Sequence, residues 1–596
     1  MAALFVGAAT ALFFGGSRRK GAAIAIAASV IVAAACGLIP TIQVLVTGGP
    51  LQFRCPWPVP YGEFFIELDP LSAWFLLPTL LLSALCAIYG VGYLPGHEKQ
   101  RSLGPGCFFY NLLVLGMVLV LLARNAVLFI SAWELMAVAS FFLVTFDHEH
   151  ESVRSAGWIY LVATHLGTGF LLVFFILTAR ETGSMDFTVW AARGIHNPQM
   201  AGTLFLLATA GFGTKAGFMP FHVWLPEAHP AAPSHVSALM SGVMIKTGIY
   251  GLLRAFTFLG APPLWWGWVF IGIGLSSGVF GVLFALAQHD LKRLLAYHSV
   301  ENIGIIALGM GVGLIGMNLN LPVLAALGFG GALLHVLNHA LFKGLLFLGA
   351  GTVAHGAGTR DIDRLGGLLK PMPWTAATFL IGAAAISGLP PLNGFVSEFL
   401  IFLGALKGGI VTGGEAAVPL FALIAGLGLI GGLAAACFTK AFGIVFLGKP
   451  RAHHANAHEA GWAMRLPMLA LATGCVAIGL LAPFAVETLR PVLLNLTGQT
   501  AEAAAENLGA ATAPLSFIIA GSLAFILCLL ALALLRRSLL AGRAVTPDAT
   551  WGCGYARPAP RAQYTASSFA QPLTHLFRWV LGTETEIVAP SGYFPD

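Results

Sequence analysis

Six ionisable side chains lie inside hydrophobic stretches of this sequence. They are Glu134, Lys215, Lys246, His335, Lys343 and Glu398. A charged group at the centre of a bilayer costs roughly 3 kcal/mol on insertion scales, so such residues normally face a protein interior or water. Acidic and basic groups withdrawn from water also change protonation state readily. Six of them on successive hydrophobic stretches predict a route for protons or cations across a membrane.

Three ionisable residues share one helix face. His335, His339 and Lys343 follow one another at intervals of four residues, which aligns them along a helix. Three in register favour a hydrogen-bonded relay over packed core histidines, because imidazole titrates near physiological pH. The two histidines also have the spacing of a metal-binding pair, but no nearby acid or third ligand supports a metal site.

Further candidates lie beside these stretches. His298 and Glu301 are one helical turn apart and predict an access point from the cytoplasm, with capping at the membrane interface as a nearly equal alternative. The same two interpretations, an access point or an interfacial cap, apply to His222 and His229 beside the first break. For any lysine the structural alternative is snorkelling, and it suits Lys440, which lies near the end of its hydrophobic stretch.

The composition places the chain in a membrane. Of its 596 residues, 58% are hydrophobic, 9% are charged and 72 are glycine, which indicates an all-α polytopic membrane protein. A β-barrel would need alternating strands of about 10 residues, which the sequence lacks. The net charge of +6 is spread over short loops, so we expect no nucleic-acid partner. The eight cysteines form no C-x-x-C pair, so we expect no metal, iron–sulfur cluster or other cofactor in this chain.

Hydrophobic stretches predict about 15 transmembrane helices. They fall at 2–16, 21–46, 71–94, 107–123, 126–146, 156–179, 201–219, 235–258, 265–287, 294–316, 321–353, 374–404, 417–447, 464–484 and 514–535. The chain divides into N-terminal spans with an outer loop (1–69), a translocating transmembrane domain (70–450), C-terminal spans (451–539) and a cytoplasmic surface tail (540–596).

Two predicted spans contain breaks. The seventh runs into Gly213–Pro220, and the twelfth contains Ser387–Gly394 shortly before Glu398. Glycine and proline interrupt the backbone hydrogen bonds, which is tolerated at membrane depth only where protein or cavity water replaces them. Broken helices in corresponding positions of two halves point to an ion site. We therefore expect two halves of five helices, from the fourth to the eighth span and from the ninth to the thirteenth.

Basic residues predict the orientation of the chain. With the N-terminus outside, the inner loops and tail carry 20 lysines and arginines and the outer side carries seven, among them Arg54, Arg124 and Arg254. The distribution predicts a multi-pass protein of the bacterial cytoplasmic membrane, with its N-terminus outside and its C-terminus inside.

Several sequence blocks occur together in a fixed order. They are Trp133-Glu134, Gly213-x-Lys215, His222-x-Trp-Leu-Pro226-Glu-Ala-His, Lys246-x-Gly-x-Tyr-Gly251, Asp290-Leu-Lys-Arg, His339-Ala-Leu-Phe-Lys343, and Ser387–Gly394 followed by Glu398. Over roughly residues 70–450 the chain thereby resembles the antiporter-like subunits of respiratory complex I and Mrp-type antiporters. The resemblance implies two inverted five-helix repeats. It also implies that Glu134 and Lys215 form a coupled ion pair, Lys246 a bridge, Lys343 a central group and Glu398 an exit residue.

Three further stretches are similar to the large membrane subunit of hydrogenase-4 and formate hydrogenlyase complexes. They are Tyr297–Asn302, Ala436–Gly448 and the tail segment that begins at Trp551. This likeness implies a subunit without redox centres that moves H⁺ or Na⁺. Its implied partners are the lipid bilayer, other membrane subunits and a cytoplasmic hydrogenase-like arm that holds iron–sulfur clusters and a nickel–iron centre.

Three other readings stay open for the sequence. An Mrp-type Na⁺/H⁺ antiporter subunit would need no redox partner, and a proton-pumping subunit of NADH:quinone oxidoreductase would fit the same motifs. A scaffold whose buried charges only hold helices together is the non-transport alternative. In the leading interpretation, electron transfer in partner subunits shifts the Glu134–Lys215 pairing and sends a proton past Lys246 and Lys343 towards Glu398.

Overall fold

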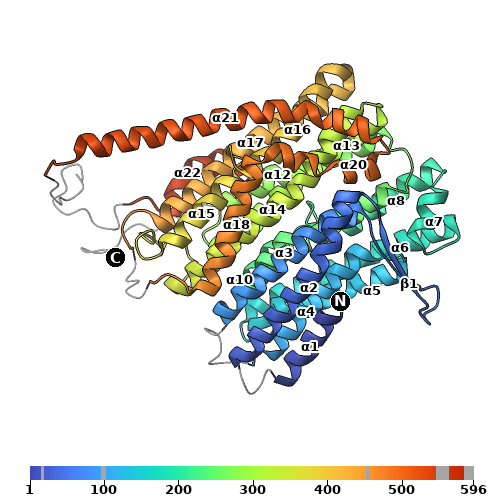
Figure 1. Cartoon of the computed structure of the whole chain (residues 1–596), viewed down its shortest axis with the longest axis horizontal. Coiled ribbons are helices and arrows are strands. Elements are labelled where there is room, and N and C mark those ends of the chain that lie inside the picture. Colours follow the sequence, from blue (N-terminus) through green and yellow to red (C-terminus); the bar gives the residue numbers. More distant parts are fainter. Residues whose placement is uncertain (15–18, 95–101, 452–456, 545–562, 583–596) are drawn as a thin grey trace.

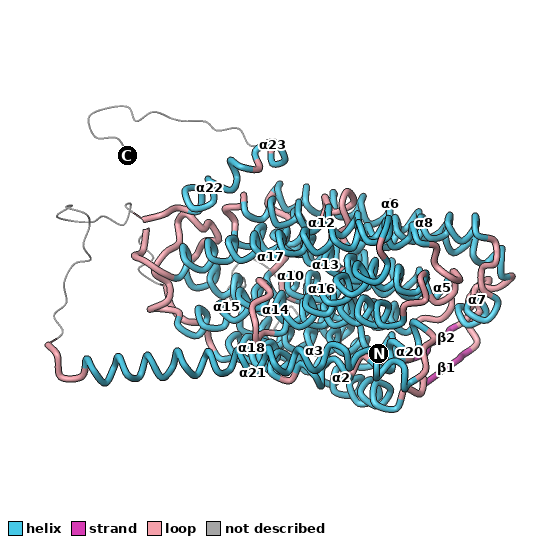
Figure 2. The backbone as a smooth tube through the Cα atoms, turned by 90° about the horizontal axis from the view of Figure 1, so that it is seen from above, coloured by secondary structure: helices cyan, strands magenta, loops and turns pink. Residues whose placement is uncertain are grey.

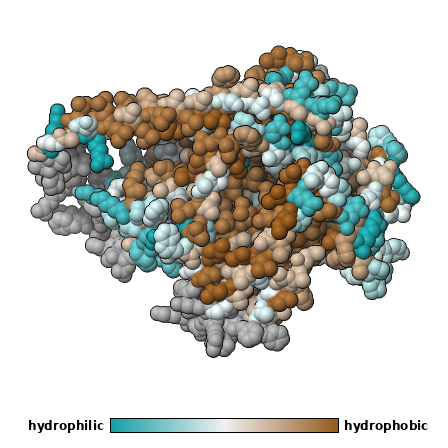
Figure 3. All heavy atoms as spheres, in the orientation of Figure 1, coloured by the Kyte–Doolittle hydropathy of each residue, from teal (hydrophilic) through white to brown (hydrophobic). Residues whose placement is uncertain are grey.

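A computed structural model describes residues 1–14, 19–94, 102–451, 457–544 and 563–582. Thirteen of the helices described are long and apolar enough to cross a membrane. Two shorter apolar helices, α1 (Ala2–Phe14) and α15 (Pro373–Ile386), and helix α8 (Pro198–Ala216) occupy further predicted spans. Hydrophobic residues cover the middle of the molecule and hydrophilic residues gather towards its two ends (Figure 3). The all-α polytopic fold is as the sequence predicts.

The N-terminal region places two helices and a hairpin against the bundle (Figure 1). Its elements are α1, α2 (Arg19–Thr47), β1 (Leu51–Cys55), β2 (Phe64–Leu68) and α3 (Pro70–Tyr93). The two strands pair in antiparallel fashion, with Leu51 opposite Leu68. The sequence analysis predicts only an outer loop here, because two strands of five residues give too short an alternation to recognise.

The first unit contains the fourth to eighth predicted spans. Its elements are α4 (Gly104–Leu122), α5 (Ala126–Val144), η2 (Thr145–Asp147), α6 (Glu151–Thr182), α7 (Phe187–Arg193), α8, α9 (Leu225–Ala231), α10 (Ser234–Leu239), the π-helix η3 (Met240–Met244) and α11 (Lys246–Phe256). The predicted break lies between α8 and α9, where Gly217 adopts a φ of 87° that ends the helix.

The second unit contains the ninth to thirteenth predicted spans. Its elements are α12 (Leu264–Leu286), α13 (Leu291–Asn318), α14 (Pro322–Ala357), α15, α16 (Asn393–Thr412) and α17 (Gly414–Phe446). The predicted break separates α15 from α16. Each unit thus holds one interrupted helix, as expected.

The two units run in opposite directions. Helix α4 ends where Ala123 pairs with Ile66 of the hairpin, whereas α12 ends where Leu286 and Gln288 accept hydrogen bonds from Lys440. We name the first end of the bundle the Arg54 face and the other, which carries His289 and Asp363, the Asp363 face. Because corresponding first helices end at opposite faces, the repeats are inverted.

The C-terminal region surrounds the second unit. Its elements are α18 (Trp462–Leu480), α19 (Ala482–Glu487), α20 (Arg490–Thr497), α21 (Ala501–Leu540), α22 (Ala566–Leu576) and α23 (Arg578–Leu581). Helix α21 packs on the bundle through Ala504, Leu508, Ala511 and Leu515 and then extends beyond it (Figure 1).

The described part of the predicted tail lies on the Asp363 face. Leu573, Phe577, Val580 and Leu581 pack against Val282 and Leu283 of α12, and Figure 2 places α22 and α23 at the side of the bundle. The Ala566 N–H donates to Asp363 at 2.7 Å. Of the similar segment that begins at Trp551, residues 551–562 lie outside the described residues.

Candidate functional site

Lys215 lies in the last turn of α8, directly before the break. Its side chain is buried, and its ammonium donates a hydrogen bond to the Tyr160 hydroxyl at 2.9 Å. The same ammonium lies 5.2 Å from the centre of the Tyr160 ring and 5.9 Å from that of Trp133. Tyr160 in turn hydrogen-bonds Ser140 of α5. The charge of Lys215 is therefore held by a hydroxyl and two aromatic faces.

The Glu134 carboxylate contacts α6 and makes no direct ion pair with Lys215 among the described residues. Its carboxylate accepts a hydrogen bond from Thr168 at 2.6 Å and lies 3.4 Å from the His165 ring nitrogen. The Glu134 side chain is 32% exposed and that of His165 is 49% exposed. The family resemblance implies an ion pair between Glu134 and Lys215, but this pair is not formed in the conformation described. Lys215 donates its hydrogen bond to Tyr160 instead, and the partners of the Glu134 carboxylate come from α6.

Replacing Tyr160 with phenylalanine is expected to slow transport about fivefold, because one hydrogen bond of about 1 kcal/mol to the Lys215 ammonium is lost. The ring stays in place, so the fold and assembly should be unchanged. Donor-driven acidification of vesicles that contain the complete complex measures the rate. Transport at the wild-type rate would show that the hydroxyl only anchors a side chain.

Lys246 meets the second unit at the centre of the molecule. Its ammonium contacts the Nδ1 atom of His339 and the backbone carbonyl of Ser241. The π-helix η3 makes that carbonyl available, since the Ile245 N–H donates to Met240, five residues back, rather than to Ser241. A local change of helix type thus aims the first unit's lysine at a histidine of α14.

A chain of polar side chains continues from His339 through the second unit. The rings of His339 and His335 are 6.3 Å apart. His335 pairs with Ser397 of α16 at 2.9 Å and with Asn302 of α13 at 3.0 Å. Asn302 donates to Glu301 at 3.4 Å. The predicted histidine relay is thus in contact with both neighbouring helices.

His298 and Glu301 are fully buried and hydrogen-bond each other. From the sequence, the two residues are predicted to form either an access point from the cytoplasm or a cap at the membrane interface. Since neither side chain is exposed, they do not cap the helix at the surface. Asp290 does this instead, because its carboxylate accepts from the N–H groups of Lys292 and Arg293.

Lys343 and Glu398 both lie in the second unit, and each has its own contacts. The Lys343 ammonium donates to the Leu295 carbonyl and lies 5.6 Å from the centre of the Phe347 ring. Glu398 lies in the first turns of α16, directly after the break, with its carboxylate against Gly388. Both side chains are buried.

A polar cavity of about 480 Å³ opens on the Asp363 face. Glu227, Asp290, Lys292, Arg293 and Arg360 line it. At its inner end Lys292 is buried and donates to the carbonyls of Pro230 and Ala232, at 3.2 and 2.5 Å.

His229 lies beside the cavity floor, one residue before Pro230. Its ring is buried between Trp224 and Phe347, and neither ring nitrogen has a hydrogen-bond partner among the residues that the structure describes. His229 lies within electrostatic reach of Lys246, Lys292 and Lys343. His222 is half-buried on the segment between α8 and α9 and joins none of the contacts given above.

Sequence reasoning missed several members of the site. Tyr160, Thr168, Asn302 and Ser397 make its contacts, but hydroxyl and amide side chains are common in membrane helices and carry no signal alone. His165 also contacts Glu134, and as an ionisable residue inside a predicted span it could have been found from the sequence. Lys440 is buried rather than snorkelling to the interface. In the parts of the chain that the structure describes, no three His, Cys, Asp or Glu side chains are grouped as metal ligands.

Comparisons with known proteins agree with this geometry. The family described as NADH:quinone oxidoreductase/Mrp antiporter, transmembrane, matches residues 123–418. Hydrogenase-4 component B of Escherichia coli is 40% identical over 92% of this chain and 82% of its own length. Formate hydrogenlyase subunit 3 of the same organism is 35% identical over 87% of this chain and 82% of its own length.

A solved structure gives the same fold. A chain of the membrane-bound sulfane sulfur reductase, an archaeal respiratory membrane complex, superimposes with a TM-score of 0.79 and 24% identity. The match covers 98% of this chain and 91% of the other.

Proposed function

Because this chain belongs to the NADH:quinone oxidoreductase/Mrp antiporter family of membrane subunits, we propose that it translocates protons within a complex-I-related respiratory oxidoreductase. The complex is of the hydrogenase-4 or formate hydrogenlyase kind, with nickel–iron and iron–sulfur centres in partner subunits. The four-part division of the chain belongs to this proposal, with residues 70–450 as the translocating domain.

One observation carries the proposal. Buried ionisable side chains lie on α8, α11, α13, α14 and α16, from Lys215 in the first unit to Glu398 in the second. Such residues are costly within a membrane and are tolerated where they move or bind ions. Lysine and histidine can exchange protons when buried, which favours H⁺ over Na⁺ as the ion.

The cavity on the Asp363 face supplies the uptake route. Its floor at Lys292 is next to His229, which lies within reach of both Lys246 and Lys343. The free ring nitrogens of His229, His298 and His339 can each hydrogen-bond a water molecule and so extend the chain of proton carriers. We assign this face to the cytoplasm in the proposal, following the orientation that the basic residues of the sequence predict.

The carboxylate of Glu134 provides the coupling element. A carboxylate next to Lys215 favours its ammonium form, and withdrawal of that carboxylate favours release of a proton. The observed conformation, with Glu134 on Thr168 and His165, is the withdrawn one. Electron transfer in the partner subunits would switch Glu134 between the two positions.

Another membrane subunit covers α5 and α6 in this proposal. Glu134 and His165 lie mid-span and partly exposed, and lipid is a poor neighbour for both. A photoreactive benzoylphenylalanine at Leu166, beside His165 and 65% exposed, is expected to cross-link to a membrane subunit. The same variant expressed without its partner subunits is the control. An adduct with lipid alone in the whole complex would contradict the covered face.

The function is tested on the native assembly. A tagged chain, isolated in mild detergent, should bring along subunits with nickel and iron, and vesicles of these membranes should acidify when the electron donor is added. Co-purification of small membrane subunits without metal, together with Na⁺-dependent proton movement, would instead identify an Mrp-type antiporter.

A further inference from the structure

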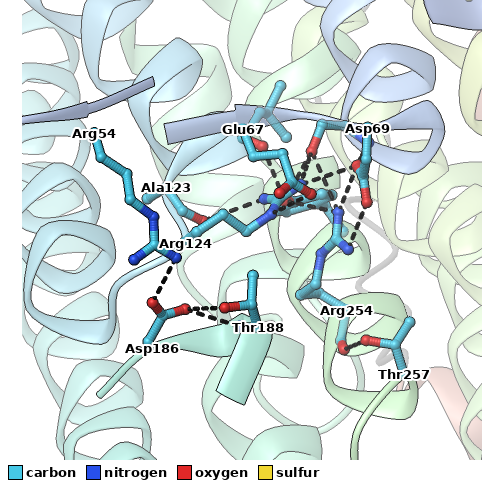
Figure 4. A network of polar contacts seen from close by, with 12 residues as sticks. Arg54, Glu67, Asp69, Ala123, Arg124, Asp186, Thr188, Arg254 and Thr257 are labelled. Carbon is cyan, nitrogen blue, oxygen red and sulfur yellow. Dashed lines mark hydrogen bonds and ion pairs between the residues drawn. The ribbon is translucent and has the colours of Figure 1, made fainter. Parts of the chain in front are cut away.

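Two buried arginines lie at the end of the first unit on the Arg54 face. Arg124, between α4 and α5, is 2% exposed, and Arg254, near the end of α11, is 8% exposed. The distribution of basic residues in the sequence predicts that both lie on the outer side. The structure instead buries them beside the hairpin (Figure 4).

Asp69 joins the two arginines. Its carboxylate oxygens accept from both terminal nitrogens of Arg254 at 2.7 and 2.8 Å, and Arg124 lies 3.0 Å from one of them. Glu67 lies 3.4 Å from the Nε atom of Arg124. We name Glu67, Asp69, Arg124 and Arg254 the Asp69 cluster. Burial alone would raise the pKa of Asp69, but the guanidiniums outweigh it and hold the pKa well below its usual range. The carboxylate therefore stays ionised.

The Asp69 cluster is in line with Lys246. Lys246, Tyr250 and Arg254 follow at intervals of four on α11 and span about 12 Å along its axis. The Tyr250 hydroxyl donates to the Leu121 carbonyl at 2.8 Å and accepts from Arg124 at 3.0 Å. The gap beside Lys246, lined by Phe75 and Leu121 among others, is too narrow for a water molecule. One helix face thus leads from the central lysine to the arginines.

Arginine cannot serve as the next proton carrier on this line. Its guanidinium does not lose its proton in proteins, so it can neither accept a proton from Lys246 nor pass one on. The second unit ends differently on the same face, where Ile305, Val312, Leu324 and Ile401 form part of an apolar cluster. Hydrophobic constrictions of that kind open when they are wetted.

We propose that the Asp69 cluster plugs the first unit at the Arg54 face, so that protons held at Lys246 leave only through the second unit. This inference rests on the proposed function, because it assumes that protons reach Lys246. It assigns Arg124 and Arg254 a role in preventing leakage, in addition to joining α3, α11 and the turn between α4 and α5.

Arginine-to-lysine substitutions test the plug. Arg254→Lys and Arg124→Lys keep a positive charge and most of the volume, but a buried lysine can release its proton. Each complex, reconstituted in liposomes with an internal pH dye, is exposed to a potassium diffusion potential without electron donor. Passive proton flux is expected to rise about 10-fold or more in each variant, because the fixed cation becomes a proton carrier. Arg54→Lys, on the same face and 47% exposed, should remain as tight as the wild type.

The outcomes distinguish a barrier to protons from a purely structural role of the Asp69 cluster. Wild-type flux in a folded Arg254→Lys or Arg124→Lys complex would overturn the plug and leave the Asp69 cluster as a purely structural tie. Asp69→Asn removes the anion that both arginines share. Its passive proton flux is measured in place of that of a lysine variant that does not fold. Adding Lys246→Met should suppress the leak, since the route passes through Lys246. Donor-driven transport in Lys215→Met tests the proposed function separately, so either idea can fail alone.

Discussion

Lys215→Met is expected to abolish donor-driven proton transport while leaving the complex assembled. Methionine has a similar length and fits the space between Tyr160 and Trp133, but it carries no proton. A positioned proton-transfer group contributes on the order of 100-fold or more to a rate, so transport should fall by at least that factor. Acidification of vesicles, with electron transfer recorded in the same sample, measures the effect.

The chain offers a matched control for this variant. Lys440 is also buried, but its ammonium donates to the carbonyls of Leu286 and Gln288, at the end of α12. Lys440→Met should therefore retain transport in whatever fraction of the complex assembles. Equal loss in both variants would mean that any buried lysine is needed for structure, and undiminished transport in Lys215→Met would contradict the proposed route.

Gly304→Val is expected to prevent stable folding. A Cβ atom at position 304 would lie 2.5 Å from the Gly278 nitrogen and 2.7 Å from the Gly274 carbonyl oxygen, both backbone atoms of α12. Backbone cannot move aside as a side chain can, so α12 and α13 would have to separate. Overpacking of this kind costs about 3 kcal/mol or more. Thermal denaturation followed by size-exclusion chromatography measures the loss.

Gly272→Val on the neighbouring helix α12 is the control, because nothing lies within 4 Å of a Cβ atom there. Its melting temperature should match that of the wild type. Should Gly304→Val melt like the control, the close approach of α12 and α13 would be wrong, and with it the placement of Glu301 and Asn302.

Much of the fold follows from the sequence because membranes constrain it strongly. A hydrophobic stretch must be long enough to cross the bilayer, and a glycine–proline pair must interrupt it. The breaks near Gly217 and Gly388 were accordingly predictable. The buried charges were also predictable, since each is costly and therefore conspicuous.

The partners of those charges were not predictable. Tyr160 hydrogen-bonds Lys215 and Thr168 hydrogen-bonds Glu134, but their hydroxyls resemble those of many other residues in membrane helices. The burial of Arg124 and Arg254 was not predictable, because a count of basic residues indicates which side of a membrane they are near and not whether they are buried. Residue types in the sequence thus predicted which groups could carry charge. Which side chains contact those groups depends on how the helices pack, and the sequence alone does not give this.

The π-helix η3 has a consequence for which changes in length this protein can tolerate. It holds one more residue per turn than an α-helix, so deletion of a single residue there would restore regular hydrogen bonding. The segment after it would keep its direction, because the wide turn absorbs the extra residue. A deletion within the regular turns of α10 or α11 would instead rotate everything after it by about 100° relative to the preceding segment. Lys246 would then turn away from His339, so η3 is the place on this helix where a residue can be lost without turning its face.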